Sequence, residues 1–204
     1  MQNSSDNDII EAGIDEAGRG CMSGRVYTAC VILPNTYPDD TYLQIIDSKK
    51  ISAKKRTILK KYIEDVALAY SVEYADIEEI ESKNILHATI AAMHRAIDKI
   101  EIKPENILVD GNYFRIYKDS EGEIIPHQTI KGGDNKYRNI AAASILAKTN
   151  HDEYVLDLLD KYPELEKYGW RKNMCYGTKQ HMDAIKAYGT SKFHRKSFGI
   201  CKNY

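Results

Sequence analysis

Two adjacent acidic residues, Asp15 and Glu16, interrupt a stretch that otherwise has the pattern of a buried β-strand. Ile10, Ala12 and Ile14 lie on one side of this stretch, and glycines follow it. A carboxylate that is buried in such a strand without a partner destabilises the fold by several kcal/mol. The folded chain must therefore bring a compensating group to this point of the strand.

Two further acids stand where a predicted strand meets a glycine-containing turn: Asp110 precedes Gly111, and Asp134 follows two glycines. Strand ends converge at one edge of an α/β sheet, where ligands bind. Clustered carboxylates need protons or divalent cations, and hard oxygen ligands suit Mg²⁺ or Mn²⁺. Because adjacent strand residues point to opposite faces, we expect Asp15 as a side-chain ligand and Glu16 to help through its carbonyl or at a second ion. Taken one at a time, each acid also fits an ordinary turn or cap residue.

Alternation and helical spacing divide the chain into strands and helices. Apolar residues spaced three and four apart predict a helix over residues 84–100, Ser52 is a candidate N-cap, and Gly189 a candidate helix stop. The other predicted elements are strands over 9–17, 25–33, 69–74, 106–110 and 124–130, and helices over 53–65, 140–159 and 178–188. Hairpin strands first and crossover helices later indicate an α/β fold, with a mixed β-sheet flanked by helices.

The C-terminal part of the chain is strongly basic although the formal net charge is only −1. Residues 167–204 contain nine Lys or Arg and a single acid, Asp183. Aromatic rings are interleaved with these charges, a composition that suits a polyanion, since cations meet phosphates and rings offer stacking faces. A solvated surface helix is the alternative reading.

Composition narrows the class of protein further. A chain of 204 residues with 43% apolar types predicts one globular domain with a real core. No apolar run is long enough to span a membrane, and the first ten residues lack the features of a secretory signal. The four cysteines form no C-x-x-C pair, so we expect a cytoplasmic protein with no membrane association.

Six motifs together resemble the ribonuclease HII family, the type 2 RNases H. They are GIDEAGRG (13–20), DSKK (47–50), VDGN (109–112), KGGDNKYRNIAAASILAK (131–148), YGTKQH (176–181) and HRKSF (194–198). They occur in the family's order and span nearly the whole chain. The resemblance implies an RNase H-like catalytic domain over residues 1–160 and a basic, helical substrate-binding region over residues 161–204 in the same compact unit.

The family resemblance also implies an activity. Such enzymes are metal-dependent endonucleases that cut the RNA strand of RNA/DNA hybrids, and they nick duplex DNA on the 5′ side of a single embedded ribonucleotide, leaving a 3′-hydroxyl and a 5′-phosphate. Carried over by motif, two Mg²⁺ or Mn²⁺ ions would be held by Asp15, Glu16, Asp110 and Asp134. We expect the chain to act as a monomer on these nucleic acids.

The same resemblance assigns residues that recognise the substrate. The family's Gly-Arg-Gly element falls on Gly18, Arg19 and Gly20, where glycines allow the backbone to approach a 2′-hydroxyl and an Arg can reach a phosphate. Tyr176 matches the tyrosine that stacks on the deoxyribose after the ribonucleotide, with helix-start packing as its alternative role.

Lys49 and His181 are assigned to contacts with the nucleic-acid backbone, and a salt bridge or a cap is the alternative role for each. Three positions depart from the family pattern. Pro is common in the family where Cys21 and Arg25 stand here, and Gly is common where Cys175 stands. If a positive φ is required at Cys175, this residue is strained there.

Alternative functions remain open on the sequence. A ribonuclease HIII would usually have Gly-Thr-Gly where this chain has Gly18-Arg19-Gly20, together with an extra N-terminal domain. A non-catalytic hybrid-binding module would keep the basic tail but would not need four converging acids. A transposase-like nuclease on the same fold would need a DNA-end-binding domain, for which we find no sequence signal.

Overall fold

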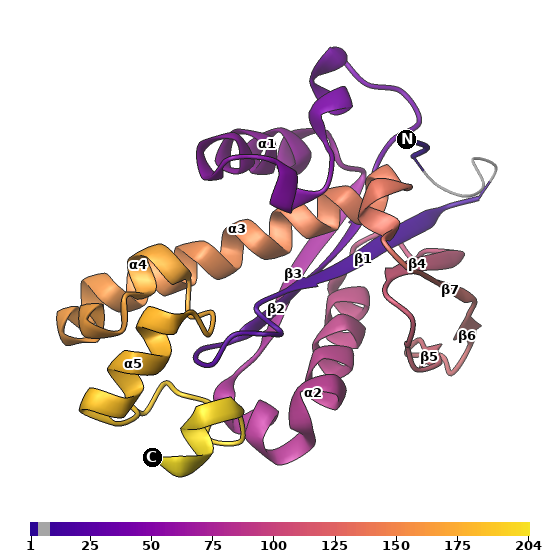
Figure 1. Ribbon diagram of the computed structural model, residues 1–204. Coiled ribbons are helices and arrows are strands. Elements are labelled where there is room, and N and C mark those ends of the chain that lie inside the picture. The colour runs from indigo at the N-terminus through magenta and orange to yellow at the C-terminus, as the bar shows by residue number, and fades with distance from the viewer. Residues whose placement is uncertain (4–8) are drawn as a thin grey trace.

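The predicted strands pair into one five-stranded mixed sheet in the computed structural model, which describes residues 1–3 and 9–204 (Figure 1). The strand order is β3-β2-β1-β4-β7. β1 (Glu11–Ala17) runs antiparallel to β2 (Val26–Ile32), and β2 runs antiparallel to β3 (Ala69–Ala75). β4 (Asn106–Asp110) is parallel both to β1 and to β7 (His127–Ile130). The predicted α/β fold around a mixed sheet is confirmed.

Three helices cover the two faces of this sheet. α2 (Ile77–Lys99) packs on one face, where Met93 and Ile97 meet Ile14 and Val109. α1 (Ala53–Val66) and α3 (Arg138–Lys161) cover the other face. The hydroxyl of Ser52 accepts a hydrogen bond from the Lys55 N–H, so the predicted N-cap of α1 is confirmed.

The remaining elements are short. Five 3₁₀ turns, one small two-stranded sheet and two C-terminal helices complete the described chain: η1 (Asp40–Gln44), η2 (Ser48–Lys50), η3 (Gly133–Asn135), η4 (Pro163–Tyr168), η5 (Gly199–Asn203), β5 (Tyr117–Lys118), β6 (Ile124–Ile125), α4 (Trp170–Asn173) and α5 (Lys179–Tyr188). Thr178 caps α5, which ends at Gly189 as predicted.

Two predicted elements differ from the structure. The helix expected over 84–100 begins already at Ile77, and Asn84 interrupts it with a φ of 64°, while its side chain accepts from two N–H groups of the next turn. The strand expected over 124–130 divides at Pro126, which has no N–H to donate. β6 before it pairs with β5, and β7 after it pairs with β4.

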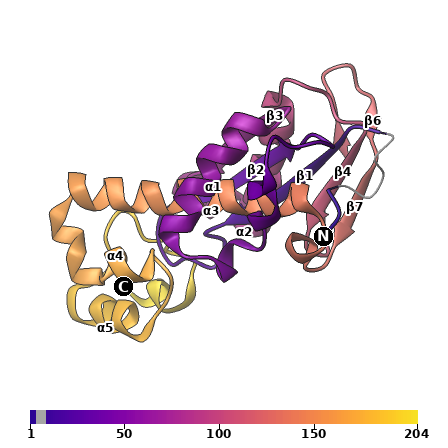
Figure 2. The same cartoon turned by 90° about the horizontal axis from the view of Figure 1, so that it is seen from above.

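The C-terminal region packs against the far end of α3. Figure 2 shows α3 running from the sheet towards α4 and α5. A separate apolar core joins the two parts, with Val155 and Leu159 of α3 against Trp170 and Ile185. None of the helices in the described residues is long and apolar enough to cross a membrane. Residues 4–8, part of the stretch that lacks secretory-signal features, lie outside the described residues.

α3 approaches β1 most closely at Gly13. A Cβ atom at this position would lie 2.2 Å from the carbonyl carbon of Asn139 and 2.3 Å from the nitrogen of Ile140, both of them backbone atoms. Asn139 then ties the helix to the sheet, because its side chain donates to the Glu11 carbonyl at 2.8 Å and accepts from the Leu33 N–H at 3.0 Å. The first glycine of GIDEAGRG therefore sets the distance between helix and sheet.

The Gly13→Ala substitution should destabilise the protein by about 3 kcal/mol or more, since backbone atoms cannot move aside as a flexible side chain can. Urea denaturation measures this change. Gly20→Ala is the matched control, because its Cβ would have only the Tyr176 ring near it, at 3.9 Å. Equal stability of the two variants would contradict the role assigned to Gly13.

Candidate functional site

The parallel pairing of β1 and β4 brings the first two acidic sites together. The register pairs Ile14 with Val109. The next residue of each strand is an aspartate, so Asp15 and Asp110 lie side by side at adjacent strand ends. Asp110 then accepts a hydrogen bond from the Gly133 N–H at 2.7 Å, which draws the turn carrying Asp134 to the same place. Positions that are far apart in the sequence thus meet at one edge of the sheet.

The carboxylates of the cluster are close enough to raise one another's pKa values. Burial raises the pKa of Asp15 well above its ordinary value, and the nearby charges of Glu16 and Asp110 raise it further. Burial also raises the pKa of Asp134, again with a contribution from Asp110. The pKa of Glu16 is raised by its burial and by Asp110, against the opposing effect of Arg19.

Polar neighbours hold several of these carboxylates in place. The Glu16 N–H donates to Asp15 Oδ1 at 2.7 Å, and the Asn135 amide donates to Asp134 Oδ1 at 2.8 Å. Ser144 of α3 hydrogen-bonds Asp15 and also lies 2.8 Å from the hydroxyl of Ser48, next to Lys49.

The donor set fits a hard divalent cation. Among residues 1–3 and 9–204, no three acidic, His or Cys side chains already surround a single point as metal ligands. The structure does gather carboxylates whose burial and mutual repulsion together raise their pKa values, and a divalent cation relieves that repulsion. Carboxylate oxygens are the ligands that Mg²⁺ and Mn²⁺ prefer.

Lys49 lies beside the cluster and forms an ion pair there, which is the alternative role considered for it, while its predicted contact with nucleic acid stays a prediction. Its Nζ is 3.9 Å from Asp134 Oδ2, and its side chain remains largely exposed. Burial alone would lower the pKa of Lys49, but the carboxylates of Asp15 and Asp134 outweigh this effect and raise it. The ammonium is therefore kept charged at the rim of the acidic cluster.

The Gly18–Gly20 turn lies next to the cluster, directly after β1. Gly18 has a φ of +86°, and a Cβ there would lie 2.4 Å from the His151 ring, so that only glycine fits. Arg19 and Gly20 are exposed, and Arg19 Nη1 lies 3.5 Å from Glu16 Oε1. The turn therefore presents exposed backbone beside the carboxylates.

Tyr176 lies against the same turn. It forms an isolated β-bridge with Cys21, its ring centroid is 6.2 Å from that of His151, and the ammonium of Lys148 lies 5.3 Å from its ring. The side chain is half-buried, with 37% of its surface exposed, so a ring face is available to a ligand. Burial raises the pKa of the Tyr176 hydroxyl, which stays protonated.

His181 does not reach the surface, so its predicted contact with nucleic acid needs correction. The ring is fully buried. Its Nδ1 lies 3.0 Å from the Tyr176 carbonyl, and its Nε2 accepts from the Trp170 indole N–H at 3.0 Å. Both ring nitrogens of His181 are thus occupied by partners inside the protein, and the side chain holds the backbone of Tyr176 instead of contacting a ligand.

Arg195 is a functional candidate that sequence reasoning missed. It was counted with the basic tail, yet it is fully buried and its guanidinium donates to backbone carbonyls of the segment 18–25. Its place in HRKSF was visible, but nothing in the sequence distinguishes a buried Arg from its exposed basic neighbours. Asp152 of α3 has a supporting role, since it pairs with Arg56 and Lys148.

The departures from the family pattern have structural consequences. Cys175 has a φ of +67°, so the strain considered for a non-glycine residue here is present. The Sγ of Cys21 lies 3.5 Å from His151 Nε2 inside the turn. The Arg25 guanidinium lies between two tyrosine rings, 3.8 Å from the centroid of Tyr74 and 4.8 Å from that of Tyr154.

Comparisons with known proteins agree with this geometry. A family model described as Ribonuclease HII matches residues 12–201. The ribonuclease HII of Bacteroides thetaiotaomicron is 47% identical over 193 residues, which cover 95% of this chain and 91% of that protein. The ribonuclease H2 of Pyrococcus horikoshii OT3 has the same fold, with a TM-score of 0.76, 22% identity and 95% of each chain covered.

A solved Bst-RNase HIII in complex with Mn²⁺ also shares the fold, with a TM-score of 0.70 and 18% identity. The match covers 95% of this chain but 68% of that one. The expected RNase H-like fold is thereby confirmed.

Replacing Asp15 by Asn should stabilise the protein when no metal is bound. Because folding raises the pKa of Asp15, the carboxyl favours the folded state below its ordinary pKa near 4, and this contribution is lost as the pH rises through the raised value. The melting temperature in EDTA at pH 7.5 should rise by a few °C, since about 1 kcal/mol corresponds to 2–4 °C at this size. The gain should shrink towards pH 4.

Asp152→Asn is the matched control for this measurement. The pKa of Asp152 is lowered, because hydrogen bonds from His151 and Lys148 outweigh the effect of its burial. Its removal should therefore lower the melting temperature at pH 7.5. A lower melting temperature for Asp15→Asn as well would contradict the description of the cluster as mutually repelling.

At position 175, glycine should give a protein at least as stable as alanine. Gly is ordinarily the less stable choice by roughly 0.5–1 kcal/mol, but a φ of +67° is unfavourable by roughly 1–2 kcal/mol for a residue with a Cβ. Comparing Cys175→Gly with Cys175→Ala removes the thiol in both. Chemical denaturation of the two variants decides the order, and a clearly more stable Ala variant would show that the strain is absent.

Proposed function

The chain belongs to the ribonuclease HII family, whose members are hydrolytic endonucleases, and we propose that it cuts two related substrates. One is the RNA strand of an RNA/DNA hybrid. The other is duplex DNA with a single embedded ribonucleotide, nicked on its 5′ side to leave a 3′-hydroxyl and a 5′-phosphate. We place this activity in the cytoplasm. We assign it to a monomer, because every group invoked below comes from one chain.

One observation supports this activity above all others: the register that aligns Ile14 with Val109 gathers buried carboxylates at one edge of the sheet. Asp15, Glu16, Asp110 and Asp134 would hold two Mg²⁺ or Mn²⁺ ions. When bound, such ions make water a better nucleophile and stabilise the leaving 3′-oxygen of the phosphodiester. A non-catalytic binding module would have no use for this repelling cluster.

The protein's own groups prepare the site. The N–H groups of Glu16 and Gly133 fix one oxygen each of Asp15 and Asp110, and Ser144 adds a further hydrogen bond to Asp15, so that these carboxylates are held in place before a ligand binds. Lys49 at the rim would attract the scissile strand and hold its phosphate near the carboxylates. α3 packs directly against Asp15, because its Ser144 hydrogen-bonds this buried carboxylate.

Recognition of the ribonucleotide is assigned to the turn after β1 and to Tyr176. The exposed backbone of Gly18, Arg19 and Gly20 can approach a 2′-hydroxyl, which both donates and accepts hydrogen bonds. The exposed face of Tyr176 would stack on the sugar of the following deoxynucleotide. Both elements touch Cys21, so the spacing between ribose and deoxyribose is read by one rigid unit.

Asp110→Asn should lower cleavage of either substrate by more than about a thousandfold, as expected for a group that contacts the reacting atoms. The fold and the binding of the hybrid should persist, because the Asn side chain can still accept the Gly133 N–H. Gel assays with mapped ends, with Mg²⁺, with Mn²⁺ and in EDTA, measure the activity. Near-normal turnover of this variant refutes the assigned role.

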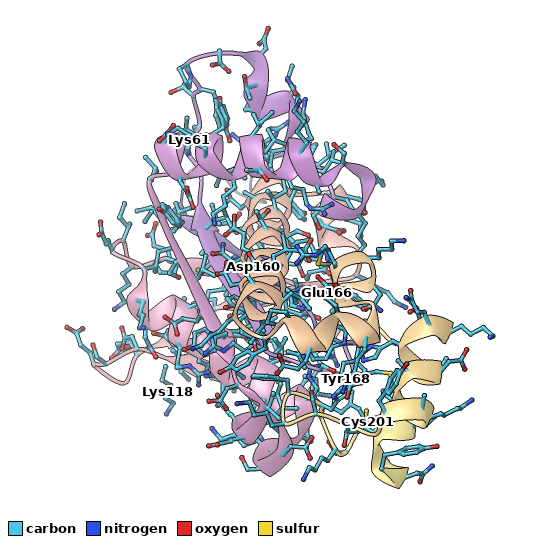
Figure 3. All side chains as sticks on the ribbon, turned by 90° about the vertical axis from the view of Figure 1, so that its left-hand side faces the viewer. Lys61, Lys118, Asp160, Glu166, Tyr168 and Cys201 are labelled. Carbon is cyan, nitrogen blue, oxygen red and sulfur yellow. The ribbon has the colours of Figure 1, made fainter. Side chains whose placement is uncertain are left out.

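Asp160→Asn is the matched control. Asp160 is labelled in Figure 3, and 73% of its side chain is exposed. Its loss should leave cleavage unchanged. The same assay separates this function from a ribonuclease HIII-like one, since a HIII-like enzyme would cut a long hybrid and leave a single embedded ribonucleotide intact.

A further inference from the structure

The guanidinium of Arg195 uses every one of its donors on a single loop. An arginine side chain has five N–H groups. In this structure they meet five backbone carbonyls at 2.8–3.0 Å, those of Gly18, Arg19, Cys21, Gly24 and Arg25. The residue itself is completely buried.

No carboxylate in the described part of the chain lies within ion-pair distance of Arg195, and burial lowers the pKa of its guanidinium. The charge is compensated by carbonyl dipoles instead. Such a cation is tolerated only while all the carbonyls remain in place, since each lost bond would leave a buried donor unpaired. The loop and Arg195 therefore fix each other's geometry.

This geometry decides what the loop presents to the outside. In a trans peptide the C=O and the following N–H point in opposite directions. Because the carbonyls of Gly18 and Arg19 point inward to Arg195, the N–H groups of Arg19 and Gly20 point outward. Both residues are exposed. Two donors thus face the place where the ribose oxygen would lie.

The backbone around Arg195 connects this loop with Tyr176. The Arg195 N–H donates to the Met22 carbonyl at 2.9 Å, and the Met22 N–H donates to the Cys175 carbonyl at 2.9 Å. Met22 of the loop is therefore hydrogen-bonded on one side to Arg195 and on the other side to Cys175, the residue before Tyr176. His194 continues the link, since its Nε2 lies 3.2 Å from that of His181, which holds the Tyr176 carbonyl.

We propose that Arg195 is a positioning residue for ribonucleotide recognition: it orients the Gly18–Gly20 backbone so that the Arg19 and Gly20 N–H groups receive the 2′-hydroxyl. This role rests on the proposed function. It concerns selectivity for a ribonucleotide and not the hydrolysis itself, because Arg195 touches none of the four carboxylates.

Arg195→Lys tests the proposal. Lysine keeps the charge but has three donors in place of five. We define selectivity as the affinity for a duplex with one ribonucleotide divided by the affinity for the same duplex in DNA, both measured in EDTA. In the variant this selectivity should fall about tenfold, while the affinity for the DNA duplex stays unchanged. A folded variant with unchanged selectivity overturns the proposal.

Arg138→Lys is the matched control. Arg138 is also buried, but its guanidinium donates to Asn3 and lies over the Tyr42 ring, away from the loop. Its substitution should lower stability and leave selectivity intact. An equal loss of selectivity in both variants would show that general destabilisation is the cause, and would also overturn the proposal.

A measurement on the unmodified protein covers the case in which Arg195→Lys does not fold. The buried Nε and Nη protons of Arg195 should exchange slowly and give resolved NMR signals. These signals should shift on addition of the ribonucleotide duplex and not of the DNA duplex. Identical responses to both would refute the role of Arg195, whereas a protein that binds the two duplexes equally would instead refute the proposed function.

Discussion

The parallel pairing of β1 with β4 is the interaction on which the rest of the molecule depends. Aligned one residue differently, these strands would send Asp15 and Asp110 to opposite faces of the sheet. α3 packs closely on β1 at Gly13 and so holds this strand in position. The hydrogen bond between Asp110 and the Gly133 N–H brings Asp134 to the same edge of the sheet. The sheet thus stores an unfavourable concentration of negative charge that the surrounding apolar packing must offset.

A second buried charge, that of Arg195, organises the turn that directly follows β1. The cluster of carboxylates is a set of anions without enough donors, whereas Arg195 is a cation surrounded by acceptors. The carboxylates lie at the end of β1 and Arg195 lies beneath the turn that follows, and the two arrangements have different effects. The first concentrates negative charge at one edge of the sheet, and the second imposes a shape on the backbone.

Much of the fold could be predicted from the sequence, and so could the convergence of acidic residues at one edge of the sheet, because both follow from local signals. Period-two and period-3.6 patterns located the strands and helices, and Asp110 and Asp134 stand beside glycines at strand ends. Pro126 shows the limit of such signals: the run from Ile124 to Ile130 is apolar enough for one strand, but its two halves have different partners.

The errors at His181 and Arg195 have a common physical origin. Both are polar residues in a basic segment, where the local composition indicates a hydrated surface. Their burial depends on partners that are distant in sequence: the carbonyl of Gly18, which Arg195 contacts, is 177 residues away. Likewise, the strain at Cys175 depends on a backbone angle that the sequence raised only as a condition.

That long separation has a consequence for the order in which the protein becomes competent during its synthesis. At roughly 5–20 residues per second, the ribosome needs about ten seconds or more to add the residues between Gly18 and Arg195. The strands and helix that assemble the carboxylates emerge before then. A nascent chain therefore gains the residues of the acidic cluster before it gains Arg195, and the shape that Arg195 imposes on the turn after β1 is completed last.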